Sequence, residues 1–80
     1  MNTKSVVQVV AHFYDSRGNE IAQVVAFNCQ GSKTETADEQ GRRYAGVFVD
    51  HGNRMVEDIQ RGIGATEVKY RNRDAMIFVN

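Results

Sequence analysis

The chain has 80 residues, of which 41% are hydrophobic and 25% are charged, and its ten basic residues balance ten acidic ones. This length supports one hydrophobic core and predicts a single domain over residues 1–80. The zero net charge argues against a strong nucleic-acid binder, because affinity for phosphate backbones depends on an excess of Lys and Arg. The lone cysteine, Cys29, excludes an internal disulfide and fits a reducing compartment.

The apolar runs of this chain are short, so no segment is predicted to cross a membrane. Residues 1–8 lack the uninterrupted apolar stretch of a secretory signal, so we expect a cytoplasmic protein. The chain contains no proline, which leaves Gly, Asn and Asp to form its turns.

Residues 5–14 and 21–29 predict two β-strands. Both segments are rich in β-branched and aromatic side chains, which favour the pleated surface of a sheet. The connecting residues 15–19 include Gly18, which we expect to adopt a positive φ. The N-terminal third of the chain is therefore predicted to be a β-hairpin.

Residues 36–63 carry apolar side chains at helical spacing. Thr36 stands three residues before Glu39, which is the spacing of a capping box. Gly62 and Gly64 suit the end of a helix. Small residues on the inner side would let the helix approach the strands closely. That inner side consists of Ala37, Gly41, Tyr44, Ala45, Phe48, Gly52, Met55, Val56, Ile59 and Ile63.

A single straight helix over this segment would be longer than the sheet that it covers. About 26 helical residues span about 40 Å, whereas strands of about nine residues span about 30 Å. Three internal glycines each cost about 1 kcal/mol in a helix, and residues 50–53 favour a turn. We therefore expect the helix to be kinked or broken near Gly52. In the alternative, residues 44–49 form a strand and residues 54–61 form a short helix.

The C-terminal residues predict a second hairpin. Residues 66–71 alternate between apolar and charged side chains, as a half-exposed edge strand does. Residues 72–74 are expected to turn the chain into an apolar strand at 75–79. The predicted fold is therefore α+β: one ββαββ domain whose four-stranded sheet is covered on one face by one long, kinked or broken helix. The strand order stays open between a β-grasp sheet and a simple antiparallel sheet.

No motif predicts catalysis or a cofactor. His12 and His51 lack a serine or cysteine at the spacing of a catalytic triad. Cys29 lacks the closely spaced second ligand of a zinc site. We therefore expect a protein that is not an enzyme, with no catalytic residues, no metal ligands and no cofactor.

The outer face of the helical segment is the first candidate for a protein-binding surface. Opposite charges stand four residues apart along it and predict three ion pairs. Patterned charge can supply specificity to a protein interface, and it is equally typical of a solvated helix. The candidate residues are Glu39, Arg43, Asp50, Arg54, Glu57 and Arg61.

Two alternatives use other surfaces. Lys69, Arg71 and Arg73 surround Tyr70, and basic side chains beside an aromatic ring can hold single-stranded nucleic acid. This cluster predicts a small nucleic-acid-binding module. The other alternative is a self-assembling structural protein, such as a homodimer, that pairs through edge strands or through an apolar sheet face.

The length, the absence of proline and the ββαββ order resemble small phage-encoded inhibitors of the anti-CRISPR type. The resemblance covers the whole chain in size and layout and includes no shared motif. It implies a phage protein that docks on a bacterial CRISPR–Cas surveillance complex in the host cytoplasm. Such an inhibitor blocks the nucleic-acid or nuclease engagement of the complex. The zero net charge differs from the strongly acidic members of that class, which imitate nucleic acid.

Overall fold

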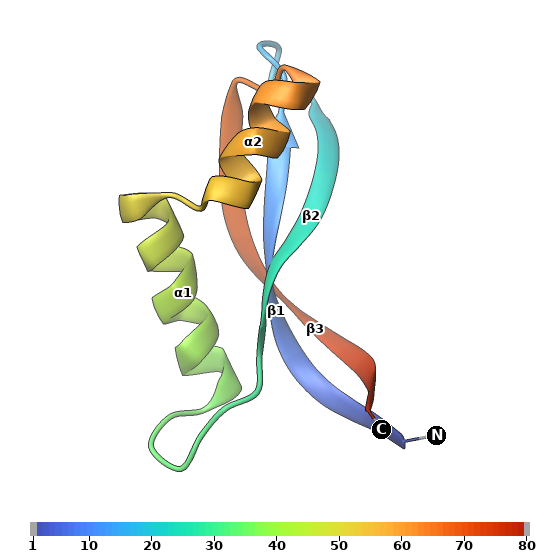
Figure 1. Ribbon diagram of the computed structural model, residues 1–80, viewed down its shortest axis with the longest axis vertical. Helices are drawn as coiled ribbons and strands as arrows, with labels where there is room; N and C mark the ends of the chain where they lie inside the picture. The colour runs from blue at the N-terminus through green and yellow to red at the C-terminus, as the bar shows by residue number, and fades with distance from the viewer. Residues whose placement is uncertain (1, 80) are drawn as a thin grey trace.

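The computed structural model describes residues 2–79 and shows an α+β fold with a three-stranded antiparallel sheet (Figure 1). The strand order is β2-β1-β3. Neither helix of the described chain is long and apolar enough to cross a membrane. The elements are β1 (Asn2–Tyr14), β2 (Glu20–Cys29), α1 (Ala37–His51), α2 (Arg54–Ile63) and β3 (Glu67–Val79).

The predicted four-stranded sheet under one long helix is wrong. Residues 67–79 form one continuous strand, β3, which pairs with β1 from Tyr14↔Glu67 to Asn2↔Val79. The predicted turn at residues 72–74 does not form, because these residues continue the ladder beside β1. Their polar side chains favour a turn locally. Pairing with an equally long neighbouring strand outweighs that preference.

The helical segment consists of two short helices with a break at Gly52. Gly52 has a φ of 77°, and its N–H donates to the carbonyl of Phe48 at 2.9 Å. A positive φ is unfavourable for residues with a side chain, so α1 ends there. Asn53 then caps α2, since its side-chain oxygen accepts from the N–H of Val56 at 3.2 Å. Residues 44–49 lie within α1, so the alternative strand at this position is not adopted.

The core lies between the helices and one face of β1. Val9 packs beneath α1 and Phe13 packs beneath α2, and both side chains are fully buried. Because alternate residues of a strand point to the same side, both helices cover one face of the sheet. Gly41 is buried in α1 and allows close approach: a Cβ there would lie 3.2 Å from a methyl group of Val7.

The opposite, helix-free face of the sheet carries polar side chains that bond across the strands. Gln8 of β1 accepts from Arg73 of β3 at 2.9 Å and donates to Asn28 of β2 at 2.9 Å. Val10 lies on the same face between its neighbours Val25 and Arg71, and it is buried. This face therefore satisfies its own polar groups without a second layer.

Strands β1 and β3 continue past the point where β2 stops pairing with β1. β2 pairs with β1 only as far as Val7↔Cys29, whereas β3 accompanies β1 to Asn2↔Val79. Residues 2–6 and 75–79 thus form a two-stranded ribbon that projects past both helices, at the lower right of Figure 1. We call these ten residues the ribbon end.

Candidate interaction surface

The ribbon end exposes two large apolar side chains on one face. Phe78 is 75% exposed and lies opposite Thr3 in the ladder. Met76 is 61% exposed and lies opposite Ser5. Residues directly opposite each other in an antiparallel pair point to the same side. On β1 this side continues to Val7, which packs beneath α1, so the exposed side chains extend the covered face of the sheet. We call Thr3, Ser5, Met76 and Phe78 the ribbon face.

A cleft of about 440 Å³ lies where the ribbon face meets α1. One wall is formed by Met76, whose sulfur accepts a hydrogen bond from the hydroxyl of Ser5 at 3.1 Å. The lining also includes Ala37, the first residue of α1, so the cleft marks the point where the helix layer stops. The lining residues are Ser5, Val6, Val7, Ala37, Asp74, Ala75 and Met76. Its mainly apolar lining suits a side chain from another protein.

The six charged residues predicted on the outer helix face are all exposed, but the helix break divides them between α1 and α2. In the part of the chain that the structure describes, Arg43 pairs with Glu35 at 2.6 Å and Arg61 pairs with Asp58. These exposed pairs replace the predicted ones and add little to stability. The surface therefore supplies charge without a large apolar contact. Its residues are Glu39, Arg43 and Asp50 on α1, and Arg54, Glu57 and Arg61 on α2.

The structure separates Tyr70 from the basic residues around it. Tyr70 points toward the helices, where its ring centroid lies 5.3 Å from that of Phe48. Burial raises the pKa of the Tyr70 hydroxyl. Lys69, Arg71 and Arg73 lie on the helix-free face, because they alternate with Tyr70 along β3. Tyr70 therefore cannot stack on a nucleic acid that these cations hold.

Two of the three cations have partners on the helix-free face. Arg73 donates to Gln8 at 2.9 Å. The Nζ of Lys69 lies 5.4 Å from the centroid of the Tyr14 ring, a distance typical of a cation–π contact. Tyr14, which the sequence did not single out for this site, is therefore the aromatic side chain that accompanies the cations. Its position follows from the β1–β3 register and could not be read from local sequence.

His12 has an acidic partner that the linear sequence did not indicate. Its Nδ1 contacts the carboxylate of Glu20 across the first hairpin, and Gln23 donates to the same carboxylate at 3.0 Å. Two hydrogen bonds lower the pKa of Glu20, and the one from His12 has a larger effect than the one from Gln23. Within residues 2–79, no serine or cysteine side chain bonds to His12 and no cluster of His, Cys, Asp and Glu could hold a metal. The contact between His12 and Glu20 links the two strands of the first hairpin.

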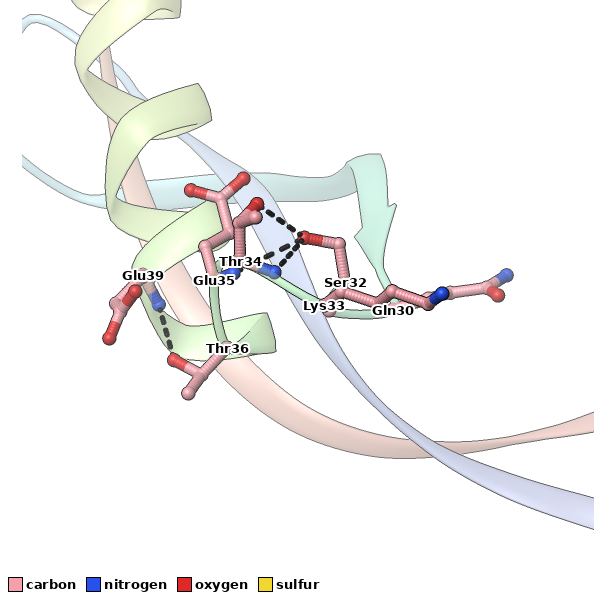
Figure 2. Close-up of a pocket in the computed structure, with 8 residues that line it drawn as sticks. Gln30, Ser32, Lys33, Thr34, Glu35, Thr36 and Glu39 are labelled. Atoms are coloured by element: carbon pink, nitrogen blue, oxygen red, sulfur yellow. Dashed lines mark hydrogen bonds between the residues drawn. The ribbon is translucent and has the colours of Figure 1, made fainter.

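The loop before α1 lines an open, shallow depression of about 450 Å³ (Figure 2). Ser32 Oγ accepts from the backbone N–H of Glu35 at 3.2 Å, and Thr36 Oγ1 accepts from that of Glu39 at 3.2 Å. The second bond is one half of the predicted capping box. Figure 2 shows Gln30 directed away from this arrangement. The polar side chains at the depression thus serve the loop and the start of the helix.

Among the described residues, the ribbon face combines the largest exposed apolar side chains with an adjoining cleft, which makes it the best candidate surface. The sequence did not indicate it, because an apolar run at residues 75–79 is equally typical of a buried strand. Comparison of the chain with protein-family models, curated proteins and solved structures gives no match.

Proposed function

We propose that this chain is a non-enzymatic protein-binding module that makes its main contact through the ribbon face. The exposure of Phe78 and Met76 beside the cleft carries this proposal. Burying an aromatic side chain removes about 150–250 Å² from water, and aromatic residues and Met are enriched in protein interfaces. Thr3 and Ser5 lie directly beside them and supply the polar groups that a partner would bond.

The charged outer helix face has a secondary role in this proposal. Its six side chains are exposed and carry both signs, so they can orient an approaching partner. Exposed charges of this kind change association rates more than they change affinity. The apolar ribbon face provides the contact area.

A photo-crosslinking experiment tests the proposal. A photoreactive phenylalanine analogue replaces Phe78 in the cells that make the protein, and the same analogue at Val49 serves as the control. Val49 lies on α1 and is 70% exposed, so its accessibility matches that of Phe78. We expect a discrete protein adduct from position 78 and none from position 49. Equal, diffuse labelling from both positions would contradict a specific contact at the ribbon face.

A narrower form of the proposal is a phage inhibitor that docks on a CRISPR–Cas surveillance complex. Its support is the resemblance in size, since the observed ββααβ order differs from the ββαββ order of the expectation. The purified chain should reduce binding of target DNA by such a complex, and Phe78→Ser should lose this effect while Val49→Ser keeps it. An inactive wild-type chain would reject this narrower form and leave the protein-binding module in place.

One observation favours a second candidate, nucleic-acid binding by the helix-free face. Lys69, Arg71 and Arg73 occupy alternate positions of β3, so they form a row on one face. Filter binding at low salt with single-stranded DNA and RNA tests this candidate, with Arg71→Glu as the variant. Retention of the wild type that Arg71→Glu abolishes would support it, and no retention of the wild type would reject it.

A further inference from the structure

We infer that the partner at the ribbon face is a second copy of this chain, so that the protein is a twofold homodimer. This inference rests on the proposed protein-binding function and names the partner of the same surface. The exposed area, the small core and the chemistry of the ribbon face each support it.

The chain exposes more surface than a monomer of its mass. Its accessible area is 5588 Å², whereas a monomer of 9.0 kDa typically exposes about 4,850 Å². The excess of about 740 Å² belongs to the whole chain, and it is of the same order as the roughly 800 Å² that each partner buries in a standard interface. The radius of gyration, 13.7 Å, likewise exceeds the value of about 11.6 Å for a compact domain of this length.

The small core gives the chain a physical reason to assemble. Eight hydrophobic residues are buried in the described chain. Domains of this size commonly gain further stability from disulfides, a structural metal or oligomerisation. Cys29 is a free thiol, and residues 2–79 contain no candidate metal cluster. Assembly through the ribbon face would add buried apolar area to this small core.

The chemistry of the ribbon face suits contact with itself. A twofold interface brings the same patch of each subunit together, so the patch must be complementary to itself. Thr3, Ser5, Met76 and Phe78 carry no charge, so pairing two such faces opposes no like charges. The flexible thioether of Met76 adapts to an aromatic ring and makes favourable sulfur–aromatic contacts. The zero net charge of the chain also removes long-range repulsion between copies.

The contact that we infer is between faces, where Met76 and Phe78 expose their side chains. Residues 2–6 of β1 have a free edge where β2 ends, but Lys4 lies in the middle of that segment. Its Nζ donates to the side chain of Gln30 at 2.8 Å, and charged edge residues hinder pairing with another strand. In the inferred dimer each ribbon face packs on the other, with Phe78 of one copy at the cleft beside Met76 of its partner.

Sedimentation equilibrium of the full chain tests the dimer over about a hundredfold range of concentration. We expect the wild type to approach twice the mass of 9.0 kDa. Phe78→Ser should raise the dissociation constant about 100-fold, as the loss of a central aromatic contact does. The matched control, Val49→Ser, should leave the constant unchanged. A wild type that stays monomeric, or a Val49→Ser variant that dissociates equally, would overturn the dimer.

A second variant keeps the test decisive if Phe78→Ser fails to fold. Phe78→Trp preserves an aromatic side chain and introduces the only tryptophan of the chain. Its emission should shift to shorter wavelength as concentration rises, because the indole leaves water at the interface. Emission that does not change with concentration would contradict burial of this position by a second copy.

The outcomes separate this inference from the proposed function. A monomeric wild type whose position 78 crosslinks to a different protein would overturn the dimer and support the protein-binding module. A crosslink between two copies of the chain would support both. A monomer without any specific adduct at position 78 would overturn both.

Discussion

Gly41 and Gly46 lie in the same helix, yet we expect the same substitutions to affect stability differently at the two positions. A Cβ at Gly41 would lie 2.7 Å from the side-chain amide of Asn72 and 3.2 Å from a methyl group of Val7. A Cβ at Gly46 would meet no atom within 4 Å. The comparison therefore measures how closely α1 approaches β1 and β3, with helix propensity held constant.

The magnitudes follow from two opposing effects. Replacing a helical glycine with alanine stabilises a helix by about 1 kcal/mol, so Gly46→Ala should raise the free energy of unfolding by about that amount. At Gly41 the exposed Asn72 amide must move and Val7 must yield slightly, so Gly41→Ala should be close to neutral. Valine adds two further carbons against β1, and overpacking of this kind costs about 1–3 kcal/mol. Gly41→Val should therefore destabilise the protein by about 1–2 kcal/mol.

Urea denaturation followed by far-UV circular dichroism measures these differences. All variants should be compared at one protein concentration, because a dimer links stability to concentration. We expect the urea midpoint of Gly46→Val to be close to that of the wild type and the midpoint of Gly41→Val to be clearly lower. Equal midpoints for the two valine variants would refute the close packing of α1 on the sheet.

Three further predictions concern single side chains. Thr36→Ala and Asn53→Ala should each lower the free energy of unfolding by about 1 kcal/mol, because each removes a helix cap. The control Asn53→Asp should retain most of the capping stabilisation. Equal urea midpoints for the alanine variants and the wild type would show that the caps do not stabilise the protein. Cys29 is fully buried, and burial raises the pKa of its thiol. The thiol should therefore be unreactive in native buffer and react with a thiol reagent only when urea unfolds the protein. Rapid reaction in native buffer would contradict its burial. The hydrogen bond from His12 holds the pKa of Glu20 below its usual value of 4.5, so the carboxylate stabilises the fold above that pH and loses this effect as the pH falls through the lowered pKa. The urea midpoints of wild type and Glu20→Gln should therefore converge below about pH 4.5, and a difference that persists in strong acid would contradict this linkage.

The features predicted correctly depend on local sequence. The first hairpin is confirmed, with Gly18 at a φ of 81° in its turn. The helix start at Thr36 and the left-handed cap at Gly64 also follow from short-range patterns. In each case the residues that determine the structure are neighbours in the chain.

The continuous strand β3 could not be predicted in the same way. Residues 72–74 have turn-forming side chains, and nothing near them in the sequence shows that β1 is long enough to pair with them. That pairing joins segments at opposite ends of the chain. The prediction of four strands was wrong because it followed the local turn propensity of residues 72–74, whereas their pairing with β1 determines the structure.

The ribbon face was missed because its exposure depends on the relative lengths of two layers. The sequence predicted strands of about nine residues and a helical segment that must break near Gly52 because, unbroken, it would be longer than those strands. The strands β1 and β3 each have 13 residues, or about 44 Å. The helices α1 and α2 have 15 and 10 residues, or about 22 Å and 15 Å, and the first of them begins only at Ala37 beside the cleft. The sheet therefore extends past the helices, and Met76 and Phe78 lose the cover that an apolar strand normally receives.

Amide spectra of the ¹⁵N-labelled protein, recorded during stepwise dilution, show whether a second copy of the chain covers the ribbon face, because each residue reports on its own surroundings. We predict that concentration-dependent shifts concentrate in residues 2–6 and 75–79 and at Ala37 beside the cleft. Spectra that do not change on dilution, or shifts confined to Lys69, Arg71 and Arg73 on the helix-free face, would contradict a dimer formed through the ribbon face.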